Sequence, residues 1–372
     1  MAEPALPPLI MGGAGFSYQL HPSPQSLPVL DIIQHAFALG LRSIDTSPYY
    51  EPSEELLGAA LSSTEISSVY RREQYQIMTK CGRIASDQFD YSPAWIRKSV
   101  ARSLQRFNTT YLDVVFCHDV EFVSLEEAAT AVGTLFDLKR QGMIKNVGIS
   151  AYDIDSLIAV SQRVLADYSQ PIDVVQNWAQ LSLQNTRLEV HGLPALKAAG
   201  VKAVCNASPL ACGLLRSGGV PVGKLGDWHP APAGLRAASQ RASTWVEEKG
   251  DSLASVGLRY ALVRSLRCSE PGFALSTITG ISTIADLVQN VMTASRILKR
   301  LAIADRELTL DPKSLIGCTV LDENAAAADE LLFDSVRRIL DRWVDYDFSA
   351  SPTIVPVEEK QSVVSVTTTP YQ

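Results

Sequence analysis

IDTSPYYEPSEELLG, residues Ile44–Gly58, is the stretch of sequence that decides the fold. Its first residues predict a short buried strand. Its last residues predict a helix with Ser53 as the N-cap and two glutamates in the first turn, where the helix dipole favours anions. Between them lies a polar loop that carries Asp45 and Tyr50. A solvated loop with a turn proline gives a similar pattern, so the interpretation depends on whether the rest of the chain repeats this order.

The same order of strand and helix recurs along the chain. Strands are predicted at 9–16 (with a turn), 43–45, 76–80, 113–117, 146–150, 173–176, 202–206 and 274–279. Helical segments are predicted at 27–39, from 53, at 92–107, at 124–142, from 155, up to 200, at 235–265 and at 283–301. Alternation of strands and helices predicts a parallel sheet, and eight such units predict a closed (β/α)8 barrel.

A doubly wound sheet is the alternative fold, and it would carry a glycine-rich phosphate loop after its first strand. Gly13 and Gly15 begin such a pattern, but Tyr18 stands where the third glycine should be. We therefore interpret these glycines as a tight first turn of a barrel. Residues 308–348 predict one or two further helices outside the barrel, and 349–372 predict a mobile tail, so that 1–348 form one domain.

Composition narrows the class of protein. The chain has 372 residues, of which 46% are hydrophobic, and a net charge of −7, which argues against binding to nucleic acid. Its six cysteines form no CxxC pair and no cluster with histidine, which suggests reduced thiols in a cytoplasmic protein without a metal site. The N-terminus does not read as a signal peptide, and no apolar run is long enough to span a membrane.

Four candidate catalytic residues lie at the carboxyl ends of the second, third and fourth predicted strands: Asp45 and Tyr50, Lys80, and His118. In a barrel these ends converge at one mouth. Free tyrosine and lysine titrate near ~10 and ~10.4, so neither exchanges protons readily at neutral pH. We expect Lys80 to lower the pKa of Tyr50, Asp45 to hold Lys80, and His118 to orient a substrate oxygen, which makes Tyr50 a general acid and base. Each residue alone is more often structural than catalytic.

These motifs resemble those of the aldo-keto reductase superfamily over roughly residues 8–300. The matching pieces are Asp-Thr-x-x-x-Tyr with Ser-Glu-x-x-Leu-Gly after it, the Thr-Lys and the histidine that end the third and fourth strands, Gly148-Ile149-Ser150, Gln176, the run 208–215, and Gly280-Ile281-Ser282 with Asn290. The resemblance implies a barrel that binds a nicotinamide dinucleotide, with Asp45, Tyr50, Lys80 and His118 as the catalytic tetrad. It also implies cofactor contacts from Ser150 and Gln176 to the carboxamide, from Ser208, Leu210 and Gly213 to the pyrophosphate, and from Gly280, Ser282 and Asn290 near the adenosine.

Three departures indicate a branch of the superfamily. Ala151 stands where the family usually has asparagine, Ala207 where it often has an aromatic residue, and Glu51 where it usually has glycine. The sequences around strand seven and the later Asp-Trp-His-Pro resemble the sugar-dehydrogenase branch, which includes D-arabinose 1-dehydrogenases and L-galactose dehydrogenases. Asp286 occupies the position where relatives that use NADP often have an arginine, so the resemblance implies NAD, unless Arg296 reaches the phosphate. An acidic residue that satisfies a helix dipole would look the same.

The sequence thus predicts a dehydrogenase that oxidises C1 of an aldose such as arabinose, galactose or fucose to the lactone, with NAD as the cofactor. Tyr18, Trp178 and Trp228 are the residues that we expect to contact the substrate. One alternative is a carbonyl reductase that uses NADPH with the same tetrad. Another is a non-catalytic barrel that binds a dinucleotide. We expect a monomer or a homodimer.

Overall fold

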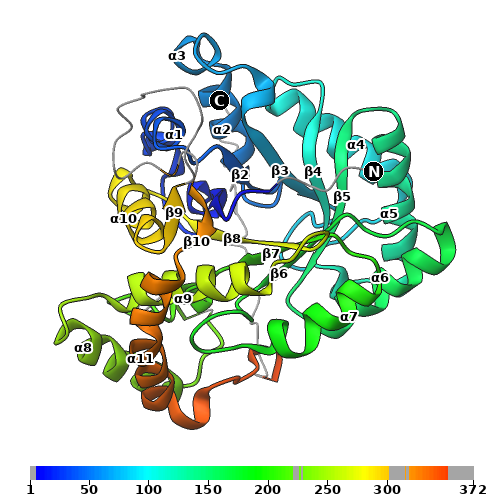
Figure 1. Cartoon of the computed structure of the whole chain (residues 1–372). Helices are drawn as coiled ribbons and strands as arrows, with labels where there is room; N and C mark the ends of the chain where they lie inside the picture. Colours follow the sequence, from blue (N-terminus) through cyan, green and yellow to red (C-terminus); the bar gives the residue numbers. More distant parts are fainter. Residues whose placement is uncertain (1–5, 221–225, 228, 301–314, 316–317, 351–372) are drawn as a thin grey trace, which may run out of the picture.

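A closed barrel of eight parallel strands forms the centre of the computed structural model, which describes residues 6–220, 226–227, 229–300, 315 and 318–350 (Figure 1). The strands are β1 (Leu9–Gly12), β2 (Ser43–Asp45), β3 (Gln76–Cys81), β4 (Leu112–His118), β5 (Ile144–Ala151), β6 (Val174–Trp178), β7 (Ala203–Ala207) and β8 (Ala274–Gly280). Because β1 also pairs with β8, the sheet has no edge. The predicted (β/α)8 barrel is confirmed, and the doubly wound sheet is wrong.

Helices surround the barrel in the predicted order. They are α1 (Val29–Ala38), α2 (Ser53–Ser62), α3 (Thr64–Ser67), α4 (Pro93–Arg106), α5 (Leu125–Arg140), α6 (Ile154–Tyr168), α7 (Leu193–Ala198), α8 (Ala233–Glu247), α9 (Leu253–Cys268) and α10 (Ile284–Ser295). Short 3-10 turns lie at Gly13–Phe16, Pro24–Ser26, Arg72–Gln74, Val120–Phe122, Ala211–Gly213, Asp341–Trp343 and Phe348–Ala350, and a π-helical turn lies at Leu188–Gly192.

Two predicted helix boundaries are wrong. The predicted helix 235–265 is two helices, α8 and α9, because Gly250 between them has φ of 79° and turns the chain. The helix predicted at 283–301 ends at Ser295. The chain then forms β9 (Leu298–Arg300), which pairs antiparallel with β10 (Cys318–Leu321) outside the barrel. The helix α11 (Glu323–Leu340) follows and packs against α8 and α9, as the prediction of outer helices anticipated (Figure 1).

The predicted N-cap at Ser53 is also wrong. Helix α2 begins at Ser53 itself, and Pro52 occupies the N-cap position without a side-chain cap. The Ser53 hydroxyl instead donates to the Gly13 carbonyl at 2.9 Å and lies 2.8 Å from the Thr46 hydroxyl. It therefore joins the loops that follow β1 and β2, which a capping pattern in the sequence does not reveal.

The core has two layers, one inside the barrel and one between the strands and the helices. Side chains along each strand point to the two layers in turn, and this determines which residues reach the site. Ile10, Met78, Val114, Phe116, Val174, Ala203, Cys205 and Ile278 fill the barrel interior, while the larger layer lies between strands and helices. Residues two apart on a strand face the same side. Lys80, His118 and Gln176 each follow an inward core residue by two positions. Their side chains therefore form the next layer upward, at the carboxyl end of the barrel.

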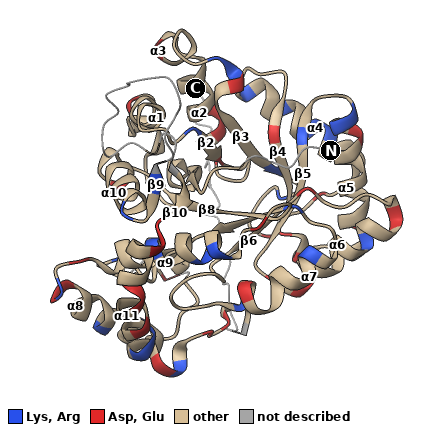
Figure 2. Cartoon of the chain, viewed as in Figure 1, with Lys and Arg blue, Asp and Glu red and all other residues tan. Residues whose placement is uncertain are grey.

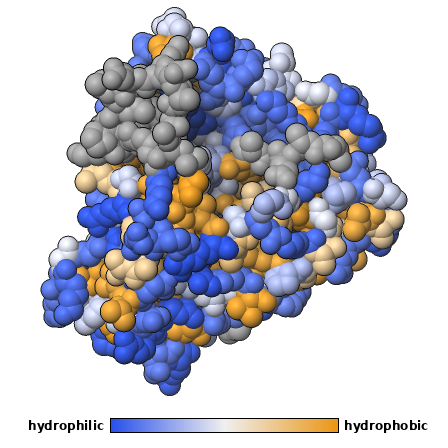
Figure 3. Space-filling view, in the orientation of Figure 1, coloured by the Kyte–Doolittle hydropathy of each residue, from blue (hydrophilic) through white to orange (hydrophobic). Residues whose placement is uncertain are grey.

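The outer surface is mixed. Acidic and basic residues are spread over the outer helices (Figure 2), and hydrophilic and hydrophobic residues are intermixed over the face seen in Figure 3. Among the described helices, none is long and apolar enough to cross a membrane. Cys81, Cys117, Cys205, Cys212 and Cys268 are free thiols.

Candidate active site

Asp45 and Lys80 form a buried ion pair at the mouth of the barrel, the end that carries the carboxyl ends of the strands. The Lys80 ammonium donates to both carboxylate oxygens of Asp45, at 3.0 and 2.8 Å, and to the Thr46 carbonyl at 2.9 Å. Burial raises the pKa of Asp45 above its ordinary value, although the Lys80 charge acts in the opposite direction. The ammonium therefore has three oxygen partners, and its charge is largely balanced by Asp45.

Tyr50 lies beside this pair. The Lys80 nitrogen is 5.1 Å from the centroid of the Tyr50 ring, within the range of a cation–π contact. Burial raises the pKa of Tyr50 well above its ordinary value, the negative charges of Asp45 and Asp119 act in the same direction, and Arg83 opposes them. The sequence predicted that Lys80 would lower this pKa. In the structure Asp45 balances the lysine charge, so burial decides the direction and Tyr50 holds its proton.

His118 faces Tyr50 from the end of β4. The two rings meet edge to face with centroids 5.7 Å apart. The Nδ1 atom of His118 lies 3.1 Å from the Ser47 hydroxyl, and its Nε2 atom lies 3.6 Å from the Asp119 carboxylate. Burial, together with the charges of Lys80 and Arg83, holds the pKa of His118 well below its ordinary value. A neutral imidazole at this place can donate one hydrogen bond to a substrate oxygen.

Asp119 and Arg83 form a second ion pair at the mouth, which the sequence did not predict. The Arg83 guanidinium binds the Asp119 carboxylate and lies over the Tyr49 ring, 4.1 Å from its centroid. Asp119 has φ of 62°, a left-handed conformation that is uncommon for a residue other than glycine and often marks a functional site. Its position directly after His118 was the one signal in the sequence. The pair adds polar groups around the position that a substrate would occupy.

Glu54, also missed as part of the site, supports β3 from behind. Its buried carboxylate accepts hydrogen bonds from the Thr79 hydroxyl at 2.6 Å and the Ser103 hydroxyl at 2.8 Å, and it pairs with Arg106 at 3.1 Å. Thr79 immediately precedes Lys80. Because a buried carboxylate is stable only when its oxygens are satisfied, this network fixes α2, β3 and α4 relative to one another.

The residues expected to hold a dinucleotide lie at the ends of β5 to β8. Ser150 and Gln176 are directly paired in the register of β5 and β6, and both are buried. A hydroxyl and an amide side by side supply the donors and acceptors that a carboxamide requires. Ala151 is the last residue of β5, and its backbone carbonyl accepts from the side-chain amide of Asn177 at 3.0 Å. Ser150 and Gln176 therefore fit the carboxamide group of a nicotinamide ring.

The loop after β7 has an unusual backbone. Ser208, Ala211 and Cys212 have φ of 53°, 49° and 55°, and Gly213 has φ of 96°. Successive residues of left- and right-handed conformation form concavities that suit anions. Leu210 lies within this loop and is partly buried. The conformation fits the predicted contact with a pyrophosphate.

Asp286 has a structural role in addition to any role in cofactor choice. It is the third residue of a capping box at the start of α10, where its carboxylate accepts from the backbone N–H groups of Ser282 and Thr283 at 3.1 and 3.0 Å. Asn290 donates to the Gly280 carbonyl at 3.2 Å and so closes the same turn. Arg296 is the C-cap of this helix. Because the helix has 12 residues, Arg296 lies about 18 Å from its N-terminus.

The expected substrate residues differ in position. Trp178 ends β6 and packs on Tyr152, with ring centroids 4.6 Å apart. Tyr18 is exposed in the loop after β1, and its backbone N–H donates to the Glu51 carbonyl at 2.9 Å. Trp228 lies outside the described residues. The roles of all three stay predictions.

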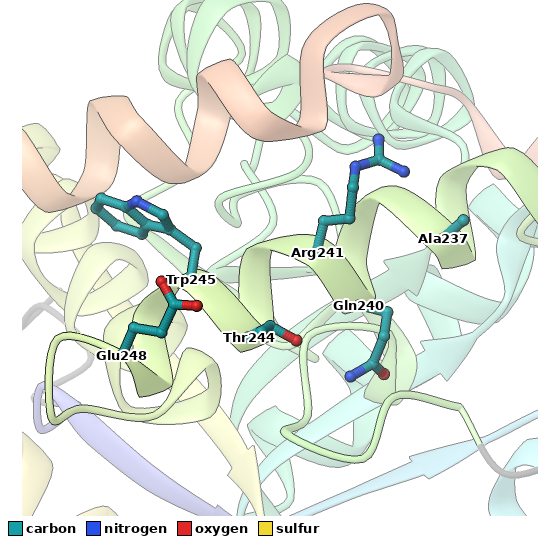
Figure 4. Close-up of a pocket in the computed structure, with 6 residues that line it drawn as sticks. All are labelled: Ala237, Gln240, Arg241, Thr244, Trp245 and Glu248. Carbon is teal, nitrogen blue, oxygen red and sulfur yellow. The ribbon is translucent and has the colours of Figure 1, made fainter.

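A shallow depression lies elsewhere, along the outer face of α8. Ala237, Gln240, Arg241, Thr244, Trp245 and Glu248 line it (Figure 4). Five of the six belong to α8 and Glu248 is its C-cap, and none of the predicted site residues is among them. Within the described part of the chain, no three His, Cys, Asp or Glu side chains gather as a metal site.

Comparison with known proteins gives a consistent result. Residues 8–303 match the family model described as the aldo/keto reductase family. The chain is 41% identical to D-arabinose 1-dehydrogenase of Saccharomyces cerevisiae over 257 residues, which cover 68% of this chain and 75% of that protein. It is 32% identical to L-galactose dehydrogenase of Arabidopsis thaliana over 287 residues, which cover 75% of this chain and 83% of that protein.

Proposed function

The chain belongs to the aldo/keto reductase family of oxidoreductases, and on this premise we propose that it oxidises the C1 hydroxyl of an aldose to the lactone with NAD. The observation that carries the proposal is the convergence of Asp45, Lys80, Tyr50 and His118 at one mouth. The names of the two relatives, an arabinose and a galactose dehydrogenase, support a sugar as the substrate.

Each of these residues has one role in the proposed reaction. The Tyr50 phenolate takes the proton of the C1 hydroxyl and becomes the neutral phenol, and the neighbouring Lys80 ammonium stabilises the phenolate before this transfer. Asp45 holds the Lys80 ammonium in position through two hydrogen bonds. His118 donates a hydrogen bond to the same substrate oxygen, where negative charge develops as the proton leaves.

A nicotinamide dinucleotide, when bound, supplies the acceptor for the C1 hydride. We assign its carboxamide to Ser150 and Gln176, its pyrophosphate to Ser208, Leu210 and Gly213, and its adenosine to Gly280, Ser282, Asp286 and Asn290. These residues lie at or just after the carboxyl ends of β5 to β8, except Asp286 and Asn290, which lie on α10. Tyr18, Trp178 and Trp228 are proposed to contact the sugar.

We assign NAD rather than NADP because of the charge at the start of α10. A carboxylate at Asp286 repels a 2′-phosphate but can accept a hydrogen bond from a ribose hydroxyl. Arg296 does not compensate, since it lies at the far end of the helix and pairs with Asp251 at 3.5 Å.

A steady-state screen tests the proposal. Pentoses and hexoses, including D-arabinose, L-galactose and L-fucose, are each assayed with NAD and with NADP, and a panel of aldehydes is assayed with NADH and NADPH. We expect oxidation of at least one aldose, with a higher kcat/KM for NAD than for NADP. Efficient aldehyde reduction with NADPH alone would assign the chain as a carbonyl reductase. Dinucleotide binding without turnover would assign it as a non-catalytic barrel.

A further inference from the structure

Ser47 lies between two groups of the active site and contacts both. It is buried in the loop after β2, between Asp45 and Tyr50. Its hydroxyl oxygen accepts the backbone N–H of Tyr49 at 3.1 Å and lies 3.1 Å from the Nδ1 atom of His118. The backbone carbonyl of Ser47 accepts from the N–H of Tyr50 at 3.0 Å. The residue is therefore held in place by its own turn.

The count of protons at this hydroxyl decides the direction of the hydrogen bond to His118. A serine hydroxyl has one proton to donate and two lone pairs that accept. The N–H of Tyr49 takes one lone pair. In the described part of the chain, the only acceptor within reach of the Ser47 proton is Nδ1 of His118. Ser47 thus donates to Nδ1, and a neutral imidazole must then carry its proton on Nε2.

The surroundings of Nε2, on the other side of the His118 ring, favour the same tautomer. Nε2 of His118 lies 3.6 Å from a carboxylate oxygen of Asp119. A protonated Nε2 is attracted to this carboxylate, whereas a bare Nε2 would turn its lone pair toward a negative charge. The partners on the two sides of the ring are independent, because one comes from the loop after β2 and the other from the residue after β4.

We propose that Ser47 is a positioning residue that fixes His118 as the Nε2–H tautomer, with this N–H directed toward the substrate oxygen. Its effect on catalysis rests on the proposed function, but the tautomer itself does not. A histidine with the opposite tautomer would present a lone pair to the developing alkoxide and repel it. Ser47 therefore acts through His118 and has no contact of its own with the reacting atoms.

Nitrogen-15 NMR of the full chain labelled at its histidine rings tests the tautomer directly. The chain has five histidines, and the variant His118→Phe identifies the signals of His118 by their absence. In the wild type we expect a protonated Nε2 and an unprotonated Nδ1. In Ser47→Ala the two nitrogen shifts should move toward each other as the second tautomer becomes populated. A protonated Nδ1 in the wild type, or shifts unchanged in Ser47→Ala, would overturn the proposal.

A double-mutant cycle tests the catalytic consequence. Ser47→Ala should lower kcat about three- to tenfold, the effect expected of one neutral hydrogen bond. In the His118→Phe background the same substitution should change kcat no further, because the ring on which Ser47 acts is gone. An equal loss in both backgrounds would show that Ser47 acts only on the stability of the loop, and would contradict its positioning role.

Ser43→Ala is the matched control for the cycle. Ser43 is a buried serine at the opposite end of β2, and its hydroxyl donates to Gln76 at 2.7 Å rather than to any tetrad residue. We expect its kcat and its His118 signals to equal those of the wild type. If no aldose is oxidised but the NMR result is as expected, the proposed function fails and the assignment of Ser47 stands.

Discussion

At the scale of single residues, the proposed site assigns the fixed positive charge to Lys80 and the transfer of the proton to Tyr50. Lys80 has three oxygen partners, so its charge is directed at Asp45 and Thr46 rather than at Tyr50 alone. Burial and the nearby carboxylates then raise the pKa of Tyr50. The tyrosine is protonated at neutral pH and ready to act as an acid, whereas sugar oxidation requires it to act as a base.

This direction predicts the pH dependence of the reaction. Because the pKa of Tyr50 is raised, the whole neutral pH range lies below it. In this range each increase of one pH unit raises the phenolate fraction about tenfold. We therefore expect kcat/KM for aldose oxidation at saturating NAD to increase steadily from about pH 6 to about pH 9. Aldehyde reduction, which uses the phenol, should change little over the same range. Circular dichroism at each pH controls for unfolding. An oxidation rate independent of pH would argue that another group takes the proton.

At the scale of elements, α2 and α4 approach so closely that only glycine fits between them. A Cβ atom built at Gly58 would lie 1.9 Å from the backbone oxygen of Arg106, a distance that no rotamer change can relieve. The Arg106 side chain turns back to bind Glu54 on α2. The Ser-Glu-x-x-Leu-Gly motif thus joins two helices behind the strand that carries Lys80.

Gly58→Ala should therefore weaken the fold. We expect a loss of about 1–3 kcal/mol in the free energy of unfolding, the usual cost of overpacking, measured by urea denaturation. Gly218→Ala is the control, since no described atom lies within 4 Å of a Cβ built there. Equal stability of Gly58→Ala and the wild type would show that α2 and α4 can separate without cost.

Element order and the convergence of the tetrad were predictable because they depend on local patterns. The order follows from the alternation of strands and helices, and the convergence of Lys80 and His118 follows from their places at strand ends. The direction of the Tyr50 pKa was not predictable, because it depends on how deeply the ring is buried and on the partners of Lys80. Pairs such as Arg83 with Asp119 connect residues far apart in sequence, which no local pattern indicates. The roles of the tetrad residues stay predictions.

At the scale of the whole molecule, the chain returns after α11 to the mouth of the barrel. Gln184 donates from its side chain to the Trp343 carbonyl at 2.9 Å, and its own carbonyl accepts from Asp345 at 2.7 Å. The Tyr152 hydroxyl accepts the N–H of Phe348 at 2.8 Å. Tyr152 lies two residues beyond Ser150, so the segment Trp343–Phe348 supports the wall of the proposed cofactor site.

Two truncations test this arrangement. A chain ending at Leu340 lacks the segment Trp343–Phe348, and we expect a lower Tm and weaker dinucleotide binding by calorimetry. A chain ending at Ala350 keeps the segment, and we expect it to match the full chain in both. The predicted tail, 349–372, begins in the turn Phe348–Ala350 and otherwise lies outside the described residues. Its dispensability, and the single domain 1–348, stay predictions. Loss of activity on ending at Ala350 would contradict them.

The central claim is that Tyr50 carries the proton in a dinucleotide-dependent oxidation, and the substitution Tyr50→Phe tests it most directly. Phenylalanine keeps the ring beside Lys80 and loses only the transferable proton. Tyr49→Phe is the matched control, because the only hydrogen bond of that neighbouring hydroxyl to the described residues is a 3.4 Å contact with Arg83. The measurement is kcat for the best aldose together with the Kd for NAD. The account predicts that Tyr50→Phe lowers kcat about 10²- to 10⁴-fold with Kd nearly unchanged, while Tyr49→Phe stays close to the wild type. A kcat for Tyr50→Phe within a few-fold of the wild type would contradict it.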